Sequence, residues 1–333
     1  IKYPEIKNIQ PIIHESIKLK VRRHLLILKL AALLIFIVAL ARPQSGQRSE
    51  DVETKGIDIM LALDSSYSMK TEDFKTCQVP ATTFCTFNVD VFPFNNVHIR
   101  KAFNYAINRA QIVRNITQLN EEPALGIIPP VLKKNRGKAQ FFQDADIETA
   151  RFHFKKGLEE LNLTEAEFPR IKYLYATSEA HHKIAQALQQ QWFATLGITI
   201  ELENVDKKIL LHLLKTRNYQ AAQSFWMAQY NDTMNILERF KYKENVKNYP
   251  NWENEEYVKL LNLSCEARTD EERFALLDQA EEIFLDEMAI APIFHWNSAY
   301  IAKPYVKSFG IAPIGNGFFD RVYIDSETKT QLR

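Results

Sequence analysis

Asp64, Ser66 and Ser68 are the residues whose types and spacing best suit metal chemistry. They follow a dense apolar run, Ile57 to Leu63, which is typical of a strand buried on both faces. Oxygens at alternate positions after such a strand can face a hard divalent cation such as Mg²⁺. The same pattern also occurs in an ordinary polar turn between a strand and a helix. Because Mg²⁺ requires an octahedral set of ligands, these oxygens alone predict only weak binding.

Composition limits the classes of function. The chain has 333 residues, enough for two domains, with 46% hydrophobic residues, 25% charged residues and a formal net charge of +1. This charge argues against a nucleic-acid partner. A phosphate-binding loop, a dinucleotide fingerprint, a nucleophile elbow, an HExxH motif and a CxxC pair are all absent from the sequence. We therefore predict a protein that is not an enzyme and needs no cofactor.

Residues 25–41 form an apolar run that contains one charge, Lys29. Its length is at the short end of what spans a bilayer, and Lys29 could extend to the interface. A basic cluster between Lys18 and Arg23 precedes the run, which predicts a cytoplasmic segment 1–24 and a periplasmic remainder. We therefore expect a transmembrane helix that anchors the chain in the inner membrane. A buried helix of a soluble core is the alternative.

The residues from this run to Phe74 resemble the start of a known membrane protein family. The run ends in ALARPQ and is followed by GIDIMLALDSSYSM and EDF. This order resembles membrane-anchored von Willebrand factor A proteins of the aerotolerance type. The resemblance implies that Asp64, Ser66 and Ser68 begin a metal-ion-dependent adhesion site, which such proteins complete with a Thr and an Asp from later loops. It ends near Phe74, so we interpret residues 42–78 as a linker and a truncated von Willebrand A domain.

Beyond this segment, hydrophobic periodicity predicts alternating strands and helices, hence an α/β fold. Phe87 to Val91 alternates as a strand, and Ile99 to Val113 shows one apolar helical face that begins after Asn96. The same reasoning predicts further helices and strands along the chain. The predicted helices are 147–161, 178–197, a short one after Asp206, 252–262 and 269–284, and the predicted strands are 171–175, 198–202 and 288–295.

Several of these segments follow the order of one family. PFNNVHIRKAFNYAINRAQIV, LYATSEAHHKIAQALQQQWFATLGITIELENV and MAIAPIFH resemble the C-terminal half of the extracellular solute-binding proteins of family 5, over residues 79–325. The resemblance implies an incomplete lobe of the periplasmic-binding-protein type II kind over 79–333. It also implies peptides as ligands and the permease subunits of an ABC importer as partners. The chain would then be a fusion of two fragments, joined between Lys75 and Thr83; a metal-dependent von Willebrand A interaction protein is the alternative function.

The resemblance also implies a ligand site in Tyr219 to Phe240, which is similar to the segment that crosses the cleft in peptide-binding proteins. Gln229 stands where the family has a carboxylate for the ligand's ammonium, and Gln223 where it has a basic residue, so charge-assisted bonds are weakened. The alternative is that Phe225 and Trp226 are core aromatics. The implied peptide-binding residues are Arg217, Gln223, Phe225, Trp226, Met227, Gln229, Tyr230, Asn231 and Asp232.

Overall fold

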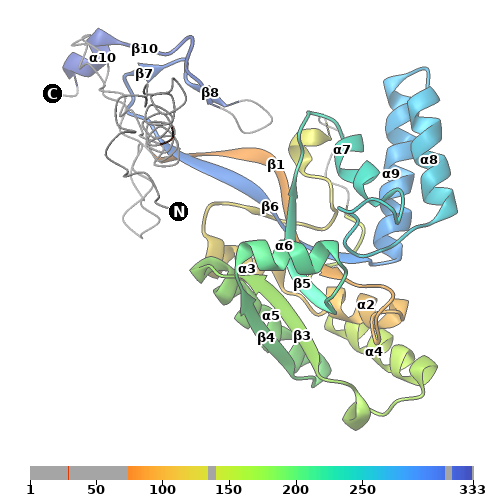
Figure 1. The fold of residues 1–333 in the computed structure, drawn as a ribbon. Helices are drawn as coiled ribbons and strands as arrows, with labels where there is room; N and C mark the ends of the chain where they lie inside the picture. Colours follow the sequence, from red (N-terminus) through yellow and green to blue (C-terminus); the bar gives the residue numbers. More distant parts are fainter. Residues whose placement is uncertain (1–28, 30–73, 134–139, 312–316, 332–333) are drawn as a thin grey trace, which may run out of the picture. The chain divides into compact units, whose positions relative to one another are not determined.

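The computed structural model describes residue 29 and residues 74–133, 140–311 and 317–331 (Figure 1). The chain divides into two compact units, Ile1–Met60 and Leu61–Arg333, and the following description concerns the second. The predicted transmembrane helix, apart from Lys29, lies outside the described residues, as do Asp64, Ser66 and Ser68. Within the described ranges, no helix is both long and apolar enough to cross a membrane.

A six-stranded mixed sheet organises this unit, with the strand order β2-β6-β1-β5-β3-β4. β1 is antiparallel to both of its neighbours, whereas β5 is antiparallel to β1 and parallel to β3. Two short two-stranded sheets follow in the C-terminal part. The strands are β1 (Phe74–Phe87), β2 (Glu122–Pro123), β3 (Ile171–Ala176), β4 (Ile200–Val205), β5 (Ala221–Met227), β6 (Ile290–Ile301), β7 (Val306–Lys307), β8 (Gly310–Ile311), β9 (Gly317–Phe318) and β10 (Tyr323–Ile324).

The position of β1 corrects one prediction and shows where another falls in the fold. The predicted strand from Phe87 to Val91 is wrong beyond its first residue, because β1 ends at Phe87. Asn88 then turns the chain, since its side-chain oxygen accepts a hydrogen bond from the Asp90 backbone N–H at 3.2 Å. The segment 75–83, which we predicted to be a join, lies within β1 at the centre of the sheet. The proline at position 80 is tolerated there because the register with β6 shifts between residues 78 and 82.

The helices agree with the predicted periodicity, with one difference. The predicted helix from Ile99 to Val113 is divided: α2 ends at Tyr105, and Asn108 caps a new helix by accepting the Gln111 N–H at 2.9 Å. Figure 1 shows α8 and α9 side by side. The helices are α2 (Val97–Tyr105), α3 (Arg109–Ile112), η4 (Val113–Thr117), η5 (Pro130–Leu132), α4 (Ile147–Leu161), η6 (Glu165–Glu167), α5 (Glu179–Leu196), α6 (Lys207–Lys215), α7 (Met234–Leu237), η7 (Glu238–Phe240), α8 (Glu255–Glu266), α9 (Asp270–Asp286) and α10 (Ser326–Gln331).

Three hydrophobic clusters join these helices to the sheet. The first joins β1, β3 and β6 to α2, α4 and α5, and it includes Phe103 and Trp192. The second joins the opposite side of β1, through Phe84, to α8 and α9. The third packs α6 against β3 and β5. Because side chains alternate between the faces of a strand, β1 contributes to both of the large clusters.

Helices α2 and α4 are also connected by a pair of histidines. The Nδ1 atoms of His98 and His153 are 2.7 Å apart, and the ring centroids are 4.9 Å apart. Burial, followed by the charges of His98, Lys101 and Lys156, lowers the pKa of His153 to about 4. Burial also lowers the pKa of His98, against the opposing effect of Glu160. Both rings are therefore neutral at pH 7, and one donates a hydrogen bond to the other.

This histidine pair predicts that the folded chain becomes less stable as the pH falls. The pKa of His153 is about 4 in the folded chain and 6.5 in a free histidine, so the unfolded chain binds the proton first. The stabilisation of the folded chain by neutral His153 is complete above pH 6.5 and is lost as the pH falls through 4. After allowance for solvent screening we expect a loss of about 1 kcal/mol, measured by urea unfolding at a series of pH values. His153→Gln should flatten this dependence, whereas His212→Gln on α6 should leave it unchanged; an equal slope in both variants would contradict the assignment.

Candidate functional site

β5 is the element that carries most of the predicted ligand residues. All of its residues, Ala221 to Met227, pair with β1 on one side. On the other side only Ala221 and Ala222 pair with β3. Along Gln223–Met227, therefore, the described part of the chain provides no second neighbouring strand. The backbone N–H and C=O groups on this open edge can pair with an added strand.

The side chains of β5 change from buried to exposed along the strand, since Ala221 to Ser224 are all buried and exposure begins at Phe225. Gln223 is 4% exposed, whereas Phe225 and Met227 are each 38% exposed. The Phe225 ring stacks on Trp296 of β6 with centroids 5.0 Å apart. Trp226 is partly buried against the second hydrophobic cluster. The open edge is thus flanked by aromatic surface on one face of the sheet and by core on the other.

The residues after β5 have two different environments. Gln229, Tyr230 and Asn231 are exposed in the turn that leads to α7. Asp232 is instead held within the fold: its Oδ1 accepts the Met234 N–H at 2.7 Å and pairs with Arg273 Nη2 at 2.8 Å. This carboxylate has a structural role at the start of α7. The Gln229 backbone N–H also donates to Asn235 Oδ1, at 2.9 Å, which fixes the turn.

Arg217 lies in the turn that precedes β5. It has a positive φ of 57°, and its backbone oxygen accepts a hydrogen bond from Asn88 Nδ2 at 2.8 Å. Its Nη2 donates to the backbone oxygen of Lys243. Arg217 thus joins the end of β1 to the loop 241–253, and its guanidinium faces that loop.

Arg239 is a buried cation that we did not predict as a site residue. It is 2% exposed and lies in an aromatic cage formed by Phe84, Trp226, Phe240 and Tyr249. Burial lowers its pKa to about 10, so it is charged at pH 7. No sequence pattern predicts this cage, because an arginine in a short helix is ordinary and the cage residues come from separate elements.

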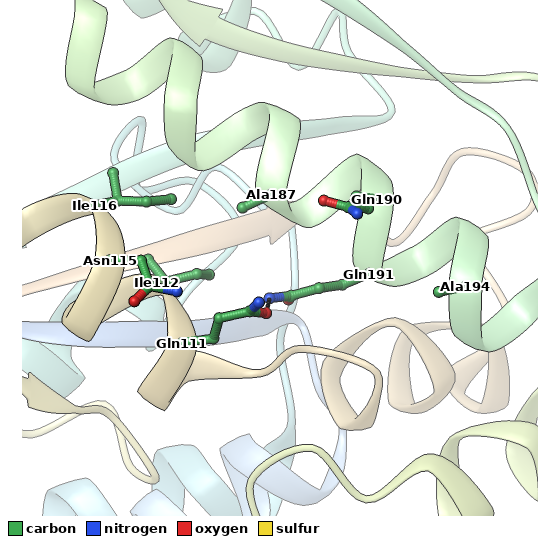
Figure 2. Close-up of a pocket in the computed structure, with 8 residues that line it drawn as sticks. All are labelled: Gln111, Ile112, Asn115, Ile116, Ala187, Gln190, Gln191 and Ala194. Carbon is green, nitrogen blue, oxygen red and sulfur yellow. Dashed lines mark hydrogen bonds between the residues drawn. The ribbon is translucent and has the colours of Figure 1, made fainter.

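A half-open pocket of about 320 Å³ lies elsewhere, between the α3–η4 segment and α5. Figure 2 shows that the side-chain amides of Gln111 and Gln191 meet within it, and these form a hydrogen bond of 3.1 Å. None of the predicted ligand residues lines this pocket. Its lining residues are Gln111, Ile112, Asn115, Ile116, Ala187, Gln190, Gln191 and Ala194.

Comparison with known families decides what this architecture is. The family model described as "Bacterial extracellular solute-binding proteins, family 5 Middle" matches residues 33–248. The chain belongs to this family. The match begins well before residue 79, where we placed the start of the resemblance, and it includes the whole segment interpreted as a von Willebrand A fragment. It thus gives no support to a fusion of two unrelated pieces.

Individual members of family 5 agree with this assignment. The oligopeptide-binding protein OppA of Bacillus subtilis is 38% identical over 239 residues, which cover 71% of this chain and 44% of the relative. The dipeptide-binding protein DppE of the same organism is 32% identical, covering 70% of this chain and 43% of the relative. Haemophilus influenzae OppA in complex with RPPGFSPFR has a similar structure, with a TM-score of 0.63, 28% identity, and coverage of 71% of this chain and 46% of that one.

The solved structures confirm one part of the predicted fold class, the α/β fold of the periplasmic-binding-protein type II kind, and give no support to the predicted transmembrane helix or von Willebrand A fragment. The chain spans less than half the length of these curated relatives, at 43–44% of each. The relatives are named as binding proteins, in agreement with the absence of enzyme motifs from the sequence. Domain boundaries and site residues remain predictions.

Proposed function

We propose that this chain binds peptides, as the ligand-binding part of the solute-binding component of an ABC importer. The observation that carries the proposal is the open edge of β5 along Gln223–Met227. A peptide that adds to this edge is held by main-chain hydrogen bonds, which do not depend on its sequence. The exposed Phe225 ring, which stacks on the partly buried Trp296 of β6, provides an apolar surface for its side chains.

Gln229 bears on how strongly the amino end of a peptide is bound. This residue is exposed just beyond β5, in the position where the family's carboxylate is implied. A neutral amide forms a weaker bond to an ammonium than a carboxylate does. We therefore propose broad peptide binding with little preference for a free α-amine.

Location and partners are part of the same proposal. An anchor at residues 25–41, with residues 42–333 in the periplasm and in contact with permease subunits, accounts for the apolar run and its basic flank. A metal site at Asp64, Ser66 and Ser68 has only its own sequence pattern in support, and the family match from residue 33 weighs against it.

Backbone N-methylation of a peptide tests the edge directly. A pentapeptide of alanines should bind to the full chain, and its twin with three N-methylated amides should bind at least about tenfold more weakly, because each main-chain bond contributes about 0.5–1.5 kcal/mol. Titration calorimetry measures both. An N-acetylated twin should match the parent peptide within about threefold, since Gln229 carries no charge. Equal affinities for the parent and N-methylated peptides would rule out strand addition.

A further inference from the structure

The Arg239 cage differs from the environments of the other buried cations. Four Lys or Arg side chains are buried in the described part of the chain. Arg239 is the one of these four that has no carboxylate partner there. The other three each contact one: Arg100 with Glu287 at 3.5 Å, Arg109 with Asp144 at 3.3 Å, and Lys133 with Glu281 at 2.8 Å.

The hydrogen-bonding capacity of Arg239 is only partly used. Its Nε donates to the backbone oxygen of Lys247 at 2.5 Å, whereas its buried Nη1 and Nη2 have no hydrogen-bond partner among the described residues. Within the same part of the chain, the indole Nε1 of Trp226 is likewise buried without a hydrogen-bond partner. Ring contacts at 4.6 Å to Trp226 and 4.5 Å to Tyr249 offset part of the cost of burying the charge. Because an unpaired buried charge is expensive, this constellation favours an anionic partner.

A second cation lies at the same indole. Lys247 Nζ is 5.0 Å from the Trp226 ring, and this lysine is exposed and has no ion-pair partner among the described residues. Trp226 itself belongs to the part of β5, Gln223–Met227, whose edge is open. Two positive charges therefore lie within 5.0 Å of one aromatic ring on the proposed ligand strand. Their combined field is little screened on the buried side, because water is excluded there.

We propose that Lys247 and Arg239, which both contact the Trp226 ring, form a subsite for a carboxylate of the bound peptide. This inference rests on the proposed peptide-binding function. Lys247 makes the direct contact, and Arg239 acts from within the fold as a positioning charge. The carboxylate can belong to an acidic side chain or to the peptide's C-terminus, since the recognising chemistry is the same.

Binding of matched peptides to the full chain distinguishes these sources. The probes are Ala-Ala-Glu-Ala-Ala, its Gln twin and its C-terminally amidated twin, measured by calorimetry. We expect the parent to bind about 5–10-fold more tightly than whichever twin lacks the recognised carboxylate. Lys247→Gln and Arg239→Met should each remove most of this preference, whereas Lys259→Gln, which removes an equal charge on α8, should keep it. Arg239→Met retains an unbranched apolar side chain in the cage, and its unfolding transition shows whether the fold is kept.

Each outcome bears on the proposal. Equal affinity for all three peptides, or a preference that survives in both site variants, overturns it while leaving peptide binding intact. If no peptide binds, the proposed function fails, and sodium succinate then tests the subsite alone. A saturable rise in Tm with succinate, beyond that in sodium chloride of equal ionic strength and absent in Arg239→Met, supports the subsite. If the Tm does not rise in this way, both the subsite and the proposed function are overturned.

Discussion

Replacing Glu281 by alanine is expected to lower the free energy of unfolding by about 3–5 kcal/mol. Glu281 lies on α9 and is fully buried, at 0% exposure. Its Oε1 accepts the backbone N–H groups of Ile127 and Ile128 at 2.9 and 3.1 Å, and its Oε2 accepts a hydrogen bond from Lys133 Nζ at 2.8 Å. Removing the carboxylate takes a counter-charge from a buried ammonium and leaves two buried N–H groups without their acceptor.

The neighbouring residue provides the control. Glu282 has the same side chain on the same helix but is exposed. Glu282→Ala should change the free energy of unfolding by no more than about 0.5 kcal/mol. Urea unfolding followed by circular dichroism measures both variants. Similar losses for Glu281→Ala and Glu282→Ala would show that the buried ion pair does not form as described.

Replacing Trp192 by alanine is expected to cost about 3–5 kcal/mol. Trp192 is fully buried on α5, at 0% exposure, and its Nε1 donates to the Phe103 backbone oxygen at 2.9 Å. Its ring packs against those of Phe103 and Tyr173, with centroids 5.0 and 5.5 Å away. The variant therefore leaves a large cavity and an unpaired carbonyl where α2, α5 and β3 meet.

Phe193 is the matched control for this cavity, because it follows Trp192 directly and is 59% exposed. Phe193→Ala should lower the free energy of unfolding by less than about 1 kcal/mol. Trp192→Phe should fall between the two variants, since it keeps most of the ring volume but loses the indole N–H. If Trp192→Ala unfolds at the same urea concentration as the unchanged chain, the first hydrophobic cluster is wrongly described.

The extent to which sequence predicts this fold differs between its elements. Helices such as 147–161 and 269–284 were predicted closely, because their apolar faces repeat within a short window. β1 was misplaced, since a strand buried on both faces lacks alternation, and Pro80 reads as an interruption. Glu281 could not be assigned a partner, because Lys133 lies 148 residues away along the chain.

The candidate site shows the same limit. The segment that contains β5 was found through its resemblance to one family, and the structure adds that this strand has an open edge from Gln223 to Met227. That property depends on where β3 stops pairing, which no local pattern encodes. The cage around Arg239 likewise combines Phe84 of β1 with Tyr249 of a distant loop. Contacts of this kind are set by tertiary packing alone.

The pairing of β1 with β6 has a consequence for biosynthesis. Cys77 and Ser298, which face each other in this ladder, are 221 residues apart along the chain. The ribosome must therefore add a further 221 residues after Cys77 before this residue obtains its partner on the second neighbouring strand. Such a high contact order slows folding and leaves the growing chain with an unpaired hydrophobic strand during translation. A chaperone that binds extended apolar segments has its longest opportunity at β1, from the emergence of that strand until the synthesis of β6.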